Sequence, residues 1–185
     1  MLLDITLPLT KKMITAVPEH AEHALMGHVG THFDVMEEEF PLAYTKRHGI
    51  AFDVSAVRER DVTSADICIE KVEKGDFVAF YTGFIDEIPY GEKGYFSTHP
   101  QLSHEVIDAL LLRGVAIIGI DAGGIRQGKE HVPTDRRCAQ KGTFVIENLY
   151  GLQALLPYGT FTAHTYPIRC TGITGIPCRV VAEVP

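Results

Sequence analysis

The sequence predicts a single domain of the α/β class. Its 185 residues are enough to bury one continuous hydrophobic core. A helix is predicted over residues 103–113, because Ser103 can cap its first turn and apolar residues such as Val106 and Leu110 recur at helical spacing. The apolar run Val115–Ile120 follows at once and predicts a buried strand. A helix that leads into a buried strand is the repeating unit of α/β proteins.

Further strands are predicted on both sides of this unit, where short apolar or alternating runs are separated by glycine and proline. Pro8 closes the first strand, and the dense apolar run Phe77–Tyr81 has the length of a buried strand. Residues 85–100 form a loop with glycine, proline and aromatic residues, and loops of this length often act as lids or binding loops. These strands lie at residues 2–8, 50–57, 77–81, 143–146, 161–170 and 179–184.

The composition excludes several classes of protein. The net charge of −7, with no run of basic residues, argues against a nucleic-acid partner. We see no apolar run of membrane-spanning length and no secretion signal at the start, so we expect a cytoplasmic protein. The four cysteines form no CxxC pair and are interpreted as buried free thiols; they are Cys68, Cys138, Cys170 and Cys178.

The stretch Gly27–Asp34 holds the strongest candidate for a metal site. His28, His32 and Asp34 all stand at even positions, so an extended chain would place them on one face. Gly30 would leave the space between them open, whereas a helix would turn Asp34 away from the histidines. Two imidazoles and a carboxylate are a common ligand set for zinc, manganese or iron, and a site with three ligands suits catalysis. Histidines that only satisfy local hydrogen bonds are the alternative.

Glu38 also stands at an even position, like His28, His32 and Asp34. If the chain stays extended beyond Asp34, Glu38 faces the same cavity and is a candidate general base for a water molecule activated by a metal. It could equally bind the metal directly. His20 and His23 lie on an irregular segment that could approach the site, and we interpret them as surface histidines.

Other candidate residues follow later in the chain. Glu147 comes directly after Phe-Val-Ile, and a buried carboxylate needs a metal, a cation or hydrogen-bond donors as a partner. Asp121 and residues 122–124 end a predicted strand, where ligand sites commonly lie, and are candidates for the cavity wall. His131 and Asp135 belong to a strongly polar stretch that is mostly surface, but they could turn inward.

The stretch His28-Val-Gly-Thr-His-Phe-Asp34 resembles the signature of the cyclase family, the metal-dependent hydrolases that include bacterial kynurenine formamidase and isatin hydrolase. The family pattern is roughly H-x-G-T-H-x-D-x-P-x-H. The resemblance extends along almost the whole chain in order. Further matches to family motifs are Leu3-Asp4-Ile5-Thr6, Gly75-Asp76-Phe77-Val78, Arg113-Gly114-Val115 with Gly119-Ile120-Asp121, Ile146-Glu147-Asn148-Leu149 and Thr174-Gly175-Ile176-Pro177-Cys178-Arg179.

The resemblance implies a compact α/β domain of the swivelling β/β/α type with a mixed sheet, spanning residues 1–185 and usually forming a homodimer. It also implies a divalent metal, zinc or manganese, held by His28, His32 and Asp34, with Glu147 serving the metal centre. The implied reaction is the attack of a metal-activated water on the carbonyl of a small amide, formamide or lactam.

Two departures from the family pattern bear on this expectation. The family has proline and then histidine after the aspartate, where this chain has Met36 and Glu38. Glu38 would therefore replace the usual proton-transfer histidine. A second family histidine precedes the glutamate by about a dozen residues, where this chain has Asp135, with His131 four residues earlier. A second metal position is then built from one of these residues, or only one metal binds.

Two classes of function follow from the sequence. The first is a metal-dependent hydrolase that cleaves the C–N bond of a small molecule. The second is a family member that binds a metal or a small ligand without turnover, as the missing histidines at positions 38 and 135 suggest. A lyase or isomerase that uses the same metal to stabilise an enolate is a weaker third hypothesis.

Overall fold

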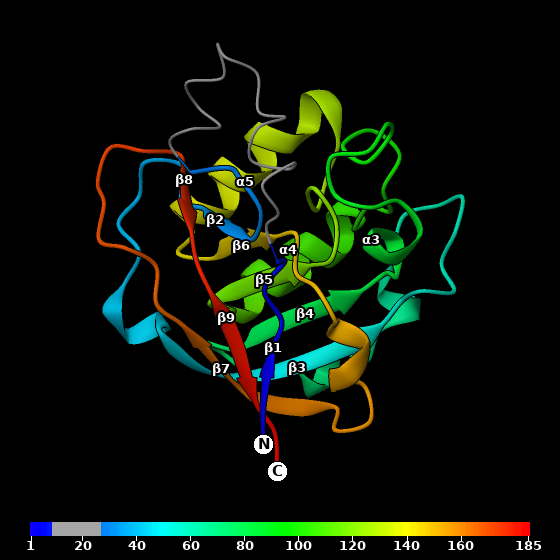
Figure 1. The fold of residues 1–185 in the computed structure, drawn as a ribbon, viewed down its shortest axis with the longest axis horizontal. Helices are drawn as coiled ribbons and strands as arrows, with labels where there is room; N and C mark the ends of the chain where they lie inside the picture. Colours follow the sequence, from blue (N-terminus) through cyan, green and yellow to red (C-terminus); the bar gives the residue numbers. More distant parts are fainter. Residues whose placement is uncertain (9–26) are drawn as a thin grey trace.

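Four parallel strands form the middle of a mixed sheet. A computed structural model describes residues 1–8 and 27–185, and within these residues the sheet has nine strands in the order β1-β9-β7-β3-β4-β5-β6-β2-β8 (Figure 1). Strands β3, β4, β5 and β6 run parallel, and the remaining neighbours pair antiparallel. The strands are β1 Leu2–Asp4, β2 His32–Asp34, β3 Lys46–Asp53, β4 Phe77–Tyr81, β5 Ile117–Ile120, β6 Phe144–Glu147, β7 Thr160–Thr165, β8 Gly175–Pro177 and β9 Val180–Glu183.

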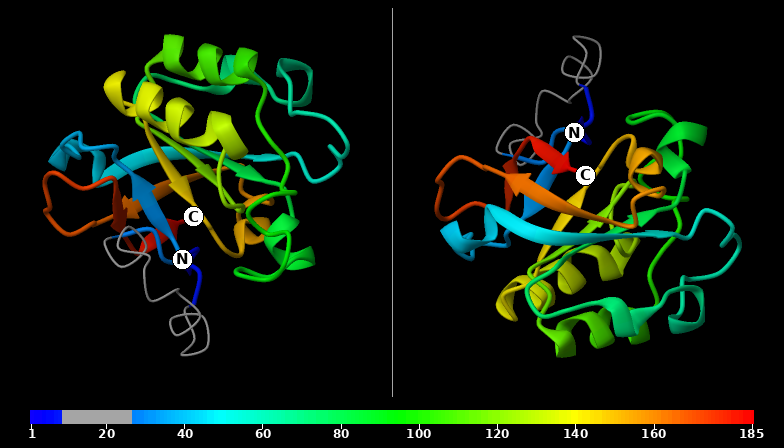
Figure 2. Two further views of the ribbon diagram at one scale, coloured as in Figure 1. Left: turned by 90° about the horizontal axis from the view of Figure 1, so that it is seen from above. Right: turned by 90° about the horizontal axis from the view of Figure 1, so that it is seen from below.

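Two helices, α4 and α5, cover one face of this sheet (Figure 2). The Ser103 hydroxyl caps α4 by accepting a hydrogen bond from the backbone N–H of Val106 at 3.2 Å. Gly114 ends the helix in the left-handed conformation, with φ of 68°. The helices are α3 Phe84–Glu87, α4 His104–Arg113 and α5 His131–Gln140, with short 3₁₀ turns at Leu42–Tyr44, Ser64–Asp66, Ile69–Lys71, Gly128–Glu130 and Leu152–Leu155.

The alternation of side chains along the central strands divides the core into two layers. On β4, Val78 and Phe80 pack toward α4, whereas Phe77 and Ala79 belong to a second cluster on the opposite face. That second cluster contains residues from both ends of the sheet, which curls over this face. Its members from the end strands are Phe33 of β2, Ile176 of β8, and Val180 and Ala182 of β9. β2 lies between β6 and β8 in this sheet, and it carries the polar residues His32 and Asp34.

The predicted α/β class and the helix over 103–113 are confirmed, and the described residues form one domain with a mixed sheet. Several predictions of strand limits are wrong. β1 ends at Asp4 and does not reach Pro8, and β7 spans Thr160–Thr165 instead of 161–170. β3 spans Lys46–Asp53 instead of 50–57, so the strand begins and ends four residues earlier than predicted. Residues 175–177, which lie between the strands predicted over 161–170 and 179–184, form a further strand, β8, because their backbone pairs with β2.

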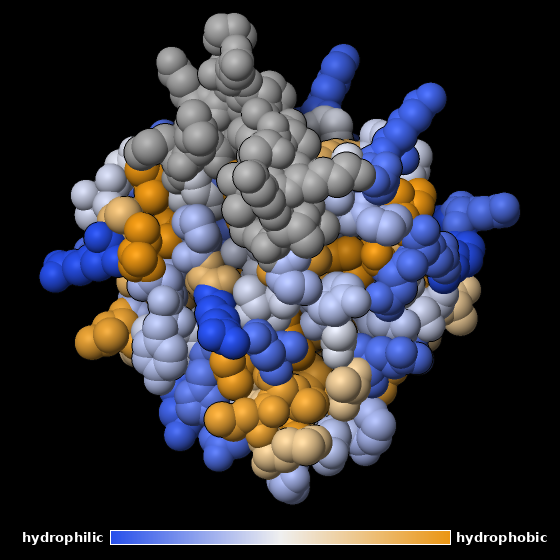
Figure 3. Space-filling view, viewed as in Figure 1, coloured by the Kyte–Doolittle hydropathy of each residue, from blue (hydrophilic) through white to orange (hydrophobic). Residues whose placement is uncertain are grey.

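The cysteines are free among the described residues, as predicted, but their predicted burial holds only for Cys138. Cys68 is exposed, and Cys170 and Cys178 are partly buried. None of the helices in the described part of the chain is long and apolar enough to cross a membrane. The surface in Figure 3 mixes polar and apolar side chains, with an apolar patch near the chain ends.

Candidate metal centre

The predicted ligand stretch is a short strand preceded by a turn. His32 and Asp34 lie on β2 and point to the same face, as the two-residue period of a strand requires. The expectation of one extended strand from His28 to Asp34 is wrong, because the backbone turns at Gly30, whose φ is 70°. The turn at Gly30, and not the alternation of side chains along a strand, therefore brings His28 close to His32.

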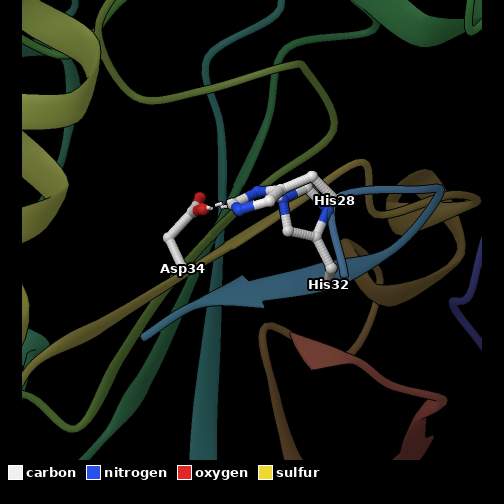
Figure 4. A group of neighbouring side chains, drawn as sticks. All are labelled: His28, His32 and Asp34. Carbon is white, nitrogen blue, oxygen red and sulfur yellow. Dashed lines mark hydrogen bonds and ion pairs between the residues drawn. The ribbon is translucent and has the colours of Figure 1, made fainter. Parts of the chain in front are cut away.

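The three predicted ligands converge on one point (Figure 4). Nδ1 of His28 lies 3.0 Å from Nε2 of His32 and 3.2 Å from Oδ1 of Asp34. Nε2 of His32 lies 3.6 Å from the same carboxylate oxygen. One donor atom from each residue thus faces the same small volume, all within 4.8 Å of one another. This is the arrangement that three ligands of one cation need.

The other nitrogen of each imidazole is held by the protein. Nδ1 of His32 lies 2.9 Å from the carbonyl oxygen of Gly30, which can only accept a hydrogen bond, so this nitrogen carries the proton. Nε2 of His28 lies 2.9 Å from the hydroxyl of Thr174. These contacts leave Nε2 of His32 and Nδ1 of His28 directed at the shared volume. Metal-binding histidines are typically oriented by such contacts.

A second group of donors adjoins the first and shares Asp34 with it. His131 and Asp135 are four residues apart on α5, which packs against β6 and β2, so both project toward the sheet. Nε2 of His131 lies 3.2 Å from Oδ2 of Asp135 and 3.0 Å from Oε1 of Glu147. Oε2 of Glu147 lies 3.7 Å from Nε2 of His32, so this glutamate faces both groups.

The buried carboxylates lack hydrogen-bond donors, which is the observation that fits a cation. Asp34 and Asp135 are each 1 % exposed, and no oxygen of either accepts a hydrogen bond of good geometry. Burial and the neighbouring carboxylates of Asp34 and Glu147 raise the pKa of Asp135 well above its ordinary range. Burying carboxylates without partners is costly, and a divalent cation would supply the missing partner.

The structure does not bring all of the predicted residues to this centre. The chain turns sharply at Met36 and Glu37, whose φ values are 47° and 75°, and Glu38 is exposed to solvent outside both donor groups. The premise that Glu38 continues the extended ligand face is therefore wrong, and the general-base role expected of Glu38 loses this geometric support. His20 and His23 lie outside the described residues.

The residues predicted to form a cavity wall after β5 differ in what they contact: Asp121 binds backbone groups, and Gly124 lies at the centre. The Asp121 carboxylate accepts hydrogen bonds from the backbone N–H groups of Thr82 and Gly83 and from the Thr82 hydroxyl, at 2.6–2.8 Å, so it joins two strand ends. Gly124 does border the centre. A Cβ atom there would lie 2.8 Å from the backbone carbonyl oxygen of Arg126 and 3.2 Å from both Oε1 of Glu147 and Cε1 of His131, so a side chain would not fit beside the centre.

The structure places Asn148 beside the centre, and this residue is not among those predicted from the sequence. It is fully buried and adopts a positive φ of 56°. Its side-chain amide donates a hydrogen bond to the carbonyl of Gly30 at 2.9 Å, and its Oδ1 accepts one from the hydroxyl of Tyr95 at 2.7 Å. A buried asparagine directly after a candidate ligand was the available signal, since a buried amide needs partners.

Comparison with known proteins agrees with this geometry. The Cyclase family model, described as "Putative cyclase", matches residues 3–126. That range covers more than half of the chain and includes the whole His28–Asp34 stretch. Among curated proteins, no match to the sequence is found.

Solved structures share the fold over nearly the whole chain. A "potential metal-dependent hydrolase with cyclase activity" has a TM-score of 0.75 and 23 % identity, covering 98 % of this chain and 96 % of its own. A "predicted metal-dependent hydrolase from Bacillus stearothermophilus" has a TM-score of 0.74 and 23 % identity, with coverages of 98 % and 97 %. Isatin hydrolase A from Ralstonia solanacearum has a TM-score of 0.71 and 19 % identity, with coverages of 85 % and 72 %.

Proposed function

Because this chain belongs to the cyclase family, we propose that it is a metal-dependent hydrolase that cleaves the C–N bond of a small amide, formamide or lactam. The observation that carries the proposal is the convergence of His28, His32 and Asp34 on one point, where both oxygens of Asp34 are buried and accept no hydrogen bond of good geometry. The solved relatives named for metal-dependent hydrolysis and for isatin hydrolysis support the same reaction class.

In this proposal, His28, His32 and Asp34 hold the metal, and Glu147 serves the centre from its neighbouring position on β6. A divalent cation bound there supplies Lewis-acid polarisation of a carbonyl group and lowers the pKa of a water molecule. The Gly30 carbonyl keeps the Nδ1 proton of His32 away from the centre, so that Nε2 stays available. Gly124 keeps a side chain from crowding Glu147 and His131.

Zinc or manganese as the metal, a homodimeric or larger homo-oligomeric assembly, a small-molecule substrate and a cytoplasmic location belong to the same proposal. The ligand set of two imidazoles and one carboxylate suits either metal. The assembly is tested by sedimentation of the purified protein.

The metal content of the purified protein tests whether the protein binds a metal, which the proposal requires. We expect bound zinc or manganese in the wild type and a loss of the metal from His32→Ala, measured by elemental analysis. His164→Ala is the matched control, because His164 lies on β7 and pairs with Glu183 outside the centre. A wild-type protein that takes up neither metal would contradict the proposal.

A panel of formamides, lactams and lactones then tests the reaction. We expect metal-dependent hydrolysis of at least one C–N bond, abolished in His32→Ala and retained in His164→Ala. The exposed position of Glu38 favours a second candidate function, a family member that binds metal without turnover, because Glu38 stands where the family has its histidine and lies outside both donor groups. Metal binding without hydrolysis across the panel would support that second candidate.

A further inference from the structure

We infer that Tyr90 takes part in the proposed reaction, and that its hydroxyl group donates a hydrogen bond to the oxygen of a ligand at the His28–His32–Asp34 centre. This inference rests on the proposed function, because it takes the centre as the place where a carbonyl group reacts. Tyr90 stands in the segment 85–100, which the sequence predicts as a lid or binding loop.

The segment between α3 and α4 reaches the centre with the Tyr90 hydroxyl. The backbone N–H of Gly30 donates a hydrogen bond to this hydroxyl oxygen at 3.0 Å. Gly30 forms the turn between the two candidate histidine ligands, and its carbonyl oxygen lies 2.9 Å from Nδ1 of His32. The Tyr90 hydroxyl therefore lies against the turn that joins the two histidines.

The hydrogen of this hydroxyl is not used within the described part of the chain. A phenol hydroxyl has one hydrogen to donate and can also accept hydrogen bonds. Because the oxygen accepts from Gly30, the O–H bond points away from that N–H, and Tyr90 donates no hydrogen bond within residues 1–8 and 27–185. A hydroxyl that accepts one hydrogen bond is also a stronger donor in the next. Tyr90 thus keeps a donor available beside the centre.

Tyr95, from the same segment, shows how a tyrosine with a purely structural contact differs from Tyr90. Tyr95 is fully buried, and its hydroxyl donates a hydrogen bond to Oδ1 of Asn148 at 2.7 Å. Tyr90 is only partly buried, and its ring packs edge-on against Tyr95 and Phe96, with centroid distances of 5.4 Å and 5.7 Å. These contacts fix the ring of Tyr90 while part of its surface stays exposed.

The phenol of Tyr90 keeps its hydrogen near neutral pH, as a donor must. Burial raises the pKa of Tyr90 above its ordinary value of 10.0, the Gly30 N–H opposes this rise, and the charge of Glu147 adds to it. Glu147 is thus close enough to interact with the hydroxyl. A fixed donor of this kind stabilises the negative charge that develops on a carbonyl oxygen under attack by water.

Binding of acetohydroxamate to the zinc-loaded protein tests this inference, because this probe presents a carbonyl oxygen that carries negative charge. Tyr90→Phe removes the hydroxyl and keeps the ring. We expect this variant to bind acetohydroxamate at least about tenfold more weakly in calorimetry, as for the loss of one hydrogen bond to a charged group. Tyr158→Phe is the matched control, because Tyr158 is partly exposed and lies outside the centre.

The zinc affinity of Tyr90→Phe, measured with a chromophoric chelator, separates this role from support of the turn. It should stay within about threefold of the wild type, below the 10–100-fold loss expected when a contact that orients a ligand is removed. If the panel yields a substrate, turnover by Tyr90→Phe should fall by about 10²–10³-fold, the range for the loss of one donor to an oxyanion.

The near-ultraviolet absorption gives a further readout, since the chain has no tryptophan. A phenol that donates a hydrogen bond to an anion absorbs at longer wavelength. Acetohydroxamate should therefore produce a tyrosine difference spectrum in the wild type and in Tyr158→Phe, and this spectrum should be absent from Tyr90→Phe.

The outcomes separate this inference from the proposed function. Equal acetohydroxamate affinity in the wild type and Tyr90→Phe, or a zinc-loaded wild type that does not bind the probe, would overturn the role of Tyr90 and leave the proposed function intact. A loss of zinc affinity of about tenfold or more in Tyr90→Phe would show that the hydroxyl only supports the turn, which also overturns the inference. A wild type that binds no metal would overturn both.

Discussion

The side-chain amide of Asn148 donates a hydrogen bond to the backbone carbonyl of Gly30, with an N···O distance of 2.9 Å. The same carbonyl oxygen lies 2.9 Å from Nδ1 of His32. The Thr31 hydroxyl returns a hydrogen bond of 2.7 Å to the carbonyl of Asn148. Asn148 therefore holds the turn that separates two candidate ligands, and it does so in a left-handed conformation that asparagine tolerates better than most residues. This contact makes Asn148 a positioning residue for His32.

Asn148→Gly should lower the affinity for zinc at the His28–His32–Asp34 centre by about 10–100-fold, because it removes the support of His32 without adding backbone strain. Competition with a chromophoric chelator measures the affinity. Tyr95→Phe is the companion variant, since it removes only the hydroxyl that donates to Oδ1 of Asn148, and its effect should be smaller. Unchanged zinc affinity in Asn148→Gly would exclude the positioning role.

Glu38→Gln should change turnover less than about twofold, because Glu38 is exposed and lies beyond the turn at Met36 and Glu37. Steady-state kinetics on any substrate found in the panel measures the effect. A loss of about 10²–10⁴-fold, the range typical of removing a general base, would show that Glu38 reaches the reacting water after all.

Asp121→Ala should lower the free energy of unfolding by about 1.5–3 kcal/mol, because it leaves the buried donors of Thr82 and Gly83 without their charged acceptor. Urea unfolding of the metal-free protein measures the change. Asp108→Ala, at an exposed position, should stay within about 0.5 kcal/mol of the wild type. Equal effects of the two substitutions would show that the Asp121 contacts do not stabilise the fold.

Asp66 should make stability depend on pH in the acidic range. The Arg60 guanidinium and the backbone N–H of Thr63, both of which donate to Asp66, hold the pKa of this carboxyl well below its ordinary value of 3.8. A lowered folded-state pKa adds stability above the ordinary pKa and loses it as the pH falls further. Asp66→Asn should therefore cost about 1 kcal/mol near neutral pH.

That difference between wild type and Asp66→Asn should shrink as the pH falls from about 4 toward 2, when the wild-type carboxylate takes up its proton. Chemical unfolding curves of both proteins over this range measure it. A difference that stays constant with pH would mean that the charge of Asp66 contributes nothing.

The sequence by itself determined the features that depend on short stretches of chain. The helix over 103–113 could be predicted because its cap, its spacing and its terminal glycine are local signals. The grouping of His28, His32 and Asp34 could also be predicted, although the structure brings His28 to the others by a turn at Gly30 and not by one continuous strand. A wrong local conformation still led to the correct grouping, since the three residues are close in sequence.

Only the tertiary structure shows which residues from distant parts of the chain face the candidate centre. The polarity around α5 resembles that of any solvated helix, and nothing local shows that His131 and Asp135 face inward. They do so because α5 packs on β6 and β2 and directs one of its faces at Glu147 and Asp34. Glu38 is the opposite case. Its even position in the sequence suggested that it faces the same side as Asp34. Two residues of positive φ, Met36 and Glu37, turn the chain before Glu38, and only the folded backbone shows this turn.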